Sequence, residues 1–198
     1  MTPDTEQFLS RSMRHLAALR DSGPAPAKTT APFPEGWFDL PQEALSDLGA
    51  MMFLAALNRF HAPRTLPEAL AQFEPPLRLR QYRIFRSGGY PRAFITWAGL
   101  NRTAERRLAV DHLPLRAPDW NSGGSKWVID LVAPFGHVDQ LLRMLARNRT
   151  ETRLRTLWHN RAGTRYRVVE WTRPNHDAAV SVTSYGKGQF AKLLDGRD

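Results

Sequence analysis

Apolar residues along the chain change their spacing after Pro76, which separates a helical part from a part richer in strands. Spacings of three and four residues predict amphipathic helices over residues 5–20 and 42–58, and a shorter helix over 66–73 that ends at the prolines. Apolar and polar residues then alternate over residues 77–85, which is typical of a half-buried strand.

The second part of the chain predicts a hairpin, a central strand and several shorter elements. Ser87-Gly88-Gly89 is a hairpin turn signal, and residues 92–98 supply the partner strand. Lys126 to Val132 is a short apolar run between glycine-rich and proline-containing segments, which favours a buried strand. The other predicted elements are a helical or irregular segment over 101–110, a helix over 138–147, strands over 152–159, 165–172 and 180–184, and a helix over 189–194.

This order predicts an α+β fold, a mixed α/β sandwich with a mostly antiparallel central sheet flanked by helices. GNAT-type acyltransferases have the same order. In that fold the phosphates of the acyl donor lie at the N-terminus of the helix that follows the central strand, where free N–H groups favour anions. The corresponding residues here are Gly136, His137 and Val138, which we predict to bind the donor.

Proline and glycine separate the first residues from the rest. Residues 22–36 have the composition of a linker, so we predict an appendage over residues 1–40 and a main domain over 41–198. The apolar face of the helix over 5–20 would need cover, which predicts partner docking or a homodimer contact.

Composition excludes several classes of chemistry. The 198 residues contain no cysteine, which excludes disulfides, thiolate nucleophiles and cysteine-bound zinc. The start of the chain lacks the basic character of a secretory signal, and no apolar run is long enough for a membrane span. We therefore expect a cytoplasmic protein.

The formal net charge is +9, and all but four of the 28 basic residues are arginine. Such a charge suits an acidic partner, although a GC-rich genome would also enrich arginine. Between residues 143 and 171 arginines are interleaved with Trp158, Tyr166 and Trp171. Alternation would direct these aromatic residues inward and the arginines outward, so we expect no nucleic-acid partner.

Asp130 is the residue that points most directly to chemistry. It interrupts the apolar run from Trp127 to Val132, and a buried carboxylate needs a partner. His61, just after the helix over 42–58, is the candidate, because a histidine oriented by a buried carboxylate can act as a general base. The alternatives are an ion pair between Asp130 and an arginine, and His137 as the histidine. No metal-binding spacing, phosphate loop or nucleophile elbow is present.

The segment Trp120-Asn121-Ser122-Gly123 is a glycine-bearing turn beside a large aromatic residue. Trp120, Ser122 and Gly123 are predicted to shape a narrow channel for the donor. An ordinary turn before a strand would have the same composition.

Several short motifs from Leu48 to Gly136 together resemble the RTX-toxin-activating lysine acyltransferases. The motifs are Tyr90-Pro91, Thr96-Trp97-Ala98, Asp119-Trp120, Ser122-Gly123, Trp127 with Ile129-Asp130, and Ala133-Pro134-Phe135-Gly136. The resemblance implies a GNAT-like fold, acyl transfer from acyl carrier protein to internal lysines of an RTX-type protoxin, and His61 and Asp130 as the catalytic pair. It also implies that the co-substrate is acyl-phosphopantetheine, with no tightly bound cofactor.

The sequence departs from the pattern of that family near His61. Family members usually have Ser-Pro-x-His-Arg-x-Trp-Pro, whereas this chain has Asn58-Arg59-Phe60-His61-Ala62-Pro63-Arg64, and Leu131 replaces the Trp that often follows the Asp. The alternative function is therefore a non-catalytic basic adaptor of the same fold that binds an acidic protein or nucleic acid.

Overall fold

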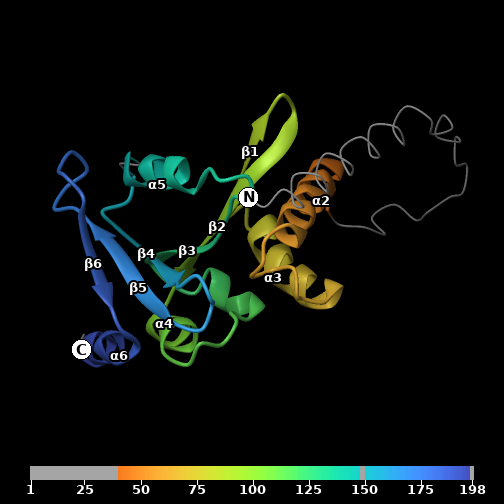
Figure 1. The fold of residues 1–198 in the computed structure, drawn as a ribbon. Helices are drawn as coiled ribbons and strands as arrows, with labels where there is room; N and C mark the ends of the chain where they lie inside the picture. The colour runs from red at the N-terminus through yellow and green to blue at the C-terminus, as the bar shows by residue number, and fades with distance from the viewer. Residues whose placement is uncertain (1–39, 148–149, 197–198) are drawn as a thin grey trace, which may run out of the picture. The chain divides into compact units, whose positions relative to one another are not determined.

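The computed structural model describes residues 40–147 and 150–196, so the predicted helix over 5–20 and the linker lie outside the described residues. The described part contains five α-helices, one short 3-10 helix and six strands (Figure 1). The helices are α2 (Gln42–Ala56), α3 (Leu66–Arg78), α4 (Arg102–Ala109), η1 (Ala117–Trp120), α5 (Val138–Arg147) and α6 (Lys187–Asp195). The strands are β1 (Tyr82–Ser87), β2 (Tyr90–Leu100), β3 (Ser125–Val132), β4 (Arg153–His159), β5 (Tyr166–Thr172) and β6 (Ser181–Tyr185).

The strands form one sheet in the order β1-β2-β3-β4-β5-β6. Every neighbouring pair is antiparallel except β3 and β4, which are parallel. The predicted α+β class with a mostly antiparallel sheet is therefore confirmed, and β3 is a central strand as expected. The closer likeness to GNAT-type acyltransferases stays a prediction.

Helix α3 is longer than the sequence predicted, and the strand after it is correspondingly shorter. A capping box between Thr65 and Glu68 fixes its start. The helix continues through Pro75 and Pro76, because the following turn keeps its hydrogen bonds, with the Leu79 N–H donating to the Pro75 carbonyl at 3.0 Å. The prediction of a strand from residue 77 was therefore wrong, since the first of these residues complete the helix.

The hairpin between β1 and β2 is confirmed. Gly88 and Gly89 have φ values of 58° and 82°, which residues other than glycine rarely adopt, and they connect the paired residues Ser87 and Tyr90.

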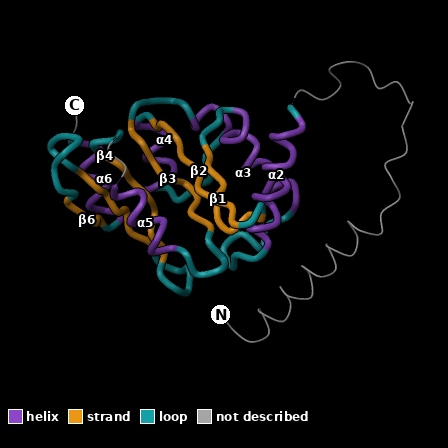
Figure 2. Tube along the Cα trace, turned by 90° about the horizontal axis from the view of Figure 1, so that it is seen from above, coloured by secondary structure: helices purple, strands orange, loops and turns teal. Residues whose placement is uncertain are grey.

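Helices cover both faces of the sheet at the end formed by β1 and β2. Consecutive residues of a strand point to opposite faces. The ring of Phe94 in β2 packs edge-on against Phe73 of α3 with centroids 5.5 Å apart, whereas its neighbour Ala93 packs with Leu141 of α5. Helices α3 and α5 therefore lie on opposite faces, and Figure 2 shows α2 and α3 beside β1 and β2.

The contact between β3 and β4 is short and divides the sheet into two antiparallel halves. The parallel register contains two pairs, Trp127 with Arg155 and Val128 with Thr156. Both strands continue beyond these pairs, β3 to Val132 and β4 to His159. The strands therefore separate toward their C-terminal ends.

A buried charge cluster closes this junction. Arg155 of β4 has no exposed surface, and its guanidinium is paired with Glu105 of α4 and Glu170 of β5. Ser125 of β3 also accepts a hydrogen bond from Arg155, at 3.0 Å. We expected arginines in this segment to point outward and aromatic residues inward. This was wrong for Arg155, which is buried against two carboxylates, and for Trp158, which is 45% exposed.

Within residues 40–147 and 150–196, no helix combines the length and the apolar character that crossing a membrane requires.

Candidate active site

Asp130 is buried in β3, as its apolar surroundings in the sequence predicted, and it has polar partners on two sides. Thr96, directly opposite on β2, donates a hydrogen bond from its hydroxyl to Asp130 Oδ2 at 2.6 Å and accepts one from the Asp130 N–H at 3.1 Å. The amide of Gln72 on α3 donates to both carboxylate oxygens, at 3.3 and 3.1 Å. These contacts fix the orientation of the carboxylate.

The backbone of β3 is irregular next to Asp130. In the register with β2, Thr96 pairs with Asp130 but Trp97 pairs with Val128, so Ile129 is an extra residue. Such a bulge changes the direction in which neighbouring side chains point, and bulges are frequent beside active sites. Here the bulge lies within two residues of the place where β3 and β4 separate.

His61 lies in the α2–α3 loop (residues 57–65) and meets Asp130, as predicted. Its Nε2 is 3.5 Å from Asp130 Oδ1, and the two side chains are 10% and 4% exposed. The imidazole also packs against Phe73, with ring centroids 5.7 Å apart. This distance is longer than a normal hydrogen bond, so a small movement of the loop would bring the imidazole and the carboxylate into hydrogen-bond contact.

The two nitrogens of His61 have different surroundings. Nε2 faces the carboxylate, whereas Nδ1 is buried and has no hydrogen-bond partner. Burial lowers the pKa of His61, and this effect outweighs the opposing effect of Asp130, while Arg64 lowers it further. The imidazole is therefore neutral at pH 7. A proton on Nε2 facing Asp130 leaves the lone pair on Nδ1.

The α2–α3 loop contacts both β3 and the end of β4. While His61 contacts Asp130, the ring of its neighbour Phe60 lies 5.9 Å from the ring of His159, the last residue of β4. Phe60 also lies against the backbone of Gly163 in the β4–β5 connection, because a Cβ on that glycine would be 3.0 Å from the Phe60 ring. The loop thus spans the place where the two strands separate.

The predicted donor-binding residues Gly136, His137 and Val138 lie at the start of α5. Val138 packs with Ala93 and Leu141, on the face of the sheet opposite α3. His137 Nδ1 is buried without a hydrogen-bond partner. His137 therefore lies at the start of a helix on the face of the sheet opposite His61. Of the two candidate histidines, the one that lies beside Asp130 is His61.

Trp120, Ser122 and Gly123 belong to a tight crossing near the end of β2. Trp120 is fully buried in the hydrophobic core. The Ser122 hydroxyl donates to the Asp119 carbonyl at 2.8 Å and accepts from the Asn101 N–H at 3.0 Å, and the Gly123 N–H donates to the Gly99 carbonyl at 3.0 Å. These contacts hold the turn against β2. The predicted channel role stays a prediction.

Two residues of this arrangement were not identified as site residues from the sequence. Thr96 belongs to the motif Thr96-Trp97-Ala98, and its polar side chain in the apolar β2 run is a signal that could have paired it with Asp130. Gln72 carries no such signal, because it is one of several polar residues on α3. Its role depends on how α3 packs against the sheet.

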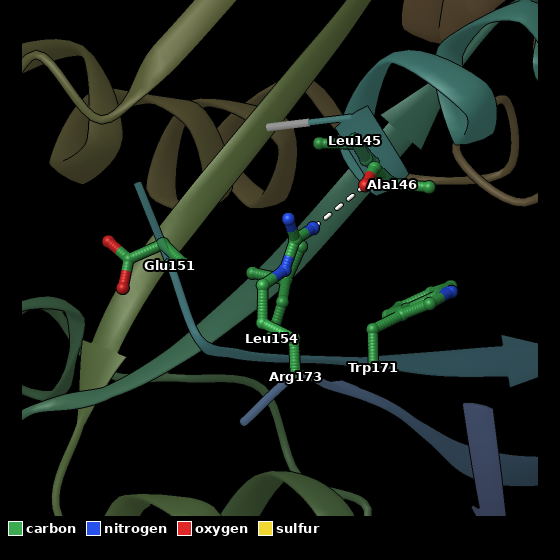
Figure 3. Close-up of a pocket in the computed structure, with 6 residues that line it drawn as sticks. All are labelled: Leu145, Ala146, Glu151, Leu154, Trp171 and Arg173. Atoms are coloured by element: carbon green, nitrogen blue, oxygen red, sulfur yellow. Dashed lines mark hydrogen bonds between the residues drawn. The ribbon is translucent and has the colours of Figure 1, made fainter. Parts of the chain in front are cut away.

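A separate shallow pocket lies between the end of α5 and strands β4 and β5 (Figure 3). It is lined by Leu145, Ala146, Glu151, Leu154, Trp171 and Arg173. Arg173 donates a hydrogen bond to the Ala146 carbonyl at 2.7 Å across it. None of the predicted site residues lines this pocket.

The described residues contain no group of three or more His, Cys, Asp or Glu side chains placed to hold a metal ion.

Comparison with known proteins is consistent with the resemblance. The chain is 34% identical over 101 residues to the RTX-I toxin-activating lysine-acyltransferase ApxIC of Actinobacillus pleuropneumoniae, which covers 51% of this chain and 59% of that protein. It is 37% identical over 94 residues to the protein-lysine myristoyltransferase HlyC of Escherichia coli, covering 46% and 53%. With the protein-lysine myristoyltransferase RtxC of Kingella kingae it shares 26% identity over 147 residues, covering 74% and 88%.

The alignments to ApxIC and HlyC thus span little more than half the length of those proteins. The alignment to RtxC spans most of the length of RtxC. The model of the RTX toxin acyltransferase family matches residues 40–172, which include His61, Asp130 and the start of α5. The chain belongs to the RTX toxin acyltransferase family.

Proposed function

We propose that this chain is a protein-lysine acyltransferase that moves a fatty acyl group from acyl carrier protein to internal lysines of an RTX-type protoxin. The observation that carries the proposal is the pair of His61 and Asp130, 3.5 Å apart and almost fully enclosed. The names of the relatives, toxin-activating lysine-acyltransferase and protein-lysine myristoyltransferase, support the reaction class.

In the proposed reaction His61 is the general base and Asp130 orients it. The lysine ε-amine is protonated at neutral pH and must lose a proton before it attacks the thioester carbonyl. Nδ1 of neutral His61 accepts that proton, and Asp130 stabilises the resulting imidazolium through Nε2. The amine forms the amide bond as the bond to the thiol sulfur breaks. The His61 imidazolium gives its proton to the leaving sulfur, and the second proton lost by the nitrogen goes to solvent.

A second route to the same product uses His61 as the nucleophile. Nδ1 would attack the thioester first and form an acyl-imidazole, from which the lysine then takes the acyl group. Mass spectrometry of the chain incubated with acylated carrier protein, with and without the protoxin, distinguishes the routes. An acyl group on His61 supports the covalent route. Its absence in both samples, while the sample with protoxin shows turnover, supports direct transfer.

The donor is proposed to approach from the other face of the sheet. The start of α5 offers helix N–H groups and the unpartnered Nδ1 of His137, which suit a phosphate. We propose that the acyl chain reaches His61 where the pairing of β3 with β4 ends, beyond Val128. The backbone of the bulge at Ile129 lies along this route and is our candidate to stabilise the oxyanion.

Access to His61 requires movement of the α2–α3 loop. Nδ1 has no accessible surface in this structure, so an amine can approach it only after the loop has shifted. Such closure excludes water from the acyl donor between turnovers. We place this reaction in the cytoplasm, where the family resemblance places both the chain and acyl carrier protein.

The test is mass spectrometry of a lysine-bearing RTX protoxin co-expressed with this chain and with its His61→Ala variant. We expect fatty acylation of internal lysines with the unchanged chain and almost none with the variant. An unmodified protoxin that binds both chains equally well would instead support the non-catalytic adaptor.

A further inference from the structure

Two histidines that the proposed reaction does not use meet beside the β4–β5 hairpin. His112 follows α4, and His159 ends β4, 47 residues later. Their Nε2 atoms are 3.3 Å apart and face each other. Two neutral imidazoles can share one proton at this distance, so the pair is a hydrogen bond in the metal-free protein.

The same separation suits two ligands of one metal ion. Zinc binds imidazole nitrogen at about 2.0–2.1 Å with tetrahedral geometry, which places two ligand nitrogens roughly 3.3–3.4 Å apart. The observed distance of 3.3 Å between the two Nε2 atoms matches this spacing. A metal ion can therefore replace the shared proton once both rings turn so that their lone pairs point at one centre beside the line between the two nitrogens.

Both rings are held in place by their surroundings. His112 stacks on Tyr166 with centroids 4.2 Å apart and planes at 17°. The Tyr166 hydroxyl donates to the Ala109 carbonyl at 3.1 Å, and Tyr166 is the cross-strand partner of His159. His112 also has a φ of 55°, a conformation that is uncommon for residues other than glycine. Fixed rings lower the entropic cost of binding a metal.

We propose that His112 and His159 bind one divalent transition-metal ion of the zinc class, with water completing the coordination. Imidazole ligands favour zinc, nickel, copper and cobalt over magnesium and calcium. The site shares no residue with the His61–Asp130 pair, but it adjoins the α2–α3 loop through the contact between His159 and Phe60. A bound metal would fix the ring against which that loop packs.

The test is calorimetric titration of the tag-free full chain with Zn²⁺ at pH 7.5. We expect one ion per chain and a loss of affinity of at least tenfold in both His112→Asn and His159→Phe. Asparagine tolerates the positive φ of position 112, and phenylalanine keeps the ring contacts of position 159. The matched control His176→Gln removes a histidine of the β5–β6 connection and should bind like the unchanged chain.

Mg²⁺ should give no saturable binding, because imidazole ligands favour zinc over magnesium. In the unchanged chain, Zn²⁺ should shift the imidazole NMR signals of His112 and His159 first, which tests the site even if a variant folds poorly. Full affinity in both variants, no saturable binding, or one ion shared by two chains would overturn the proposal.

Discussion

The imidazole of His61 is subject to two opposing effects. Burial disfavours its charged form, whereas the Asp130 carboxylate favours it, and burial dominates. The resting side chain is therefore an uncharged base next to a carboxylate that can stabilise the charge once a proton arrives. This combination suits a residue that must take a proton from an ammonium group during the reaction.

The first prediction concerns Asp130 and its partners His61 and Thr96. Asp130→Asn should lower the acylation rate by about a hundredfold to ten-thousandfold, because an amide cannot stabilise the imidazolium. Combining it with His61→Ala should add little to the larger single effect, since the two residues act as a unit. Initial rates of protoxin acylation measure both effects.

Thr96→Val should give a smaller loss, because it removes the 2.6 Å hydrogen bond to Asp130 but keeps the carboxylate. Thr172→Val is the control, since this partly buried threonine lies at the end of β5 and pairs with Arg153 and Ser181, away from Asp130 and the bulge in β3. A Thr172 variant that loses as much activity per folded molecule as the Thr96 variant would contradict a positioning role for Thr96.

The second prediction follows from the lowered pKa of His61. Between the unfolded pKa of about 6.5 and the lower folded pKa, the unfolded chain binds more protons than the folded chain. The stability of the fold should therefore fall as the pH drops below about 6.5 and stay flat with respect to this group above it.

Denaturant titrations from pH 7.5 to 5.0 measure this dependence. His159 also has a lowered pKa and contributes in the same direction, so the informative quantity is the difference between the unchanged chain and His61→Gln. The variant should lose less stability on acidification. Equal slopes would show that His61 does not carry a lowered pKa in the folded state.

At the scale of elements, the turn at Ser122 and Gly123 is constrained by its approach to β2. A Cβ at Gly123 would lie 2.7 Å from both the Asn101 nitrogen and the Leu100 carbonyl oxygen, and these are backbone atoms that cannot move aside alone. Glycine is required here for space, which explains this part of the motif without a ligand.

The third prediction is that Gly123→Ala destabilises the fold by about 1–3 kcal/mol, as overpacking does. The control is Gly124→Ala, where a Cβ would have no atom within 4 Å, and it should change the free energy of unfolding by less than about 0.5 kcal/mol. Chemical denaturation compares the two. An unaffected Gly123 variant that fails to acylate would point back to the predicted channel.

The sequence predicted most elements because their signals are local. Two consecutive glycines, which readily adopt positive φ, predict the β1–β2 hairpin. An isolated carboxylate in an apolar strand predicts that Asp130 is buried with a partner. The end of α3 was misplaced because two prolines favour a helix end, while packing of Phe73 and Leu77 in the core retains the helix. Gln72 and the meeting of His112 with His159 could not be predicted, because they depend on tertiary packing between distant segments.

At the scale of the whole molecule, the junction of the two half-sheets depends on Arg155. Its guanidinium pairs with both Glu105 of α4 and Glu170 of β5, and it lies 5.9 Å from the ring centre of Trp127 in β3. Removing one partner of a buried ion pair is costly because the remaining charges stay buried.

The fourth prediction is that Arg155→Met lowers the free energy of unfolding by about 3–5 kcal/mol. Arg106→Met is the control, because Arg106 pairs with the exposed Asp195, and it should cost less than about 1 kcal/mol. Urea titrations measure both variants. Similar costs would mean that the cluster contributes no more than a surface pair.

The narrow junction between β3 and β4 also has a consequence for the order of folding. Within each half-sheet, consecutive strands are antiparallel neighbours, whereas Glu105 and Arg155 are 50 residues apart. Contacts between distant residues close large loops and tend to form late. We therefore expect the junction to be absent from the transition state, so that Arg155→Met accelerates unfolding and leaves the refolding rate nearly unchanged in stopped-flow experiments. The proposed catalytic pair would then form in the final step of folding, because His61 contacts Asp130 from the α2–α3 loop, and Phe60, the residue before His61, packs against His159 in the other half-sheet.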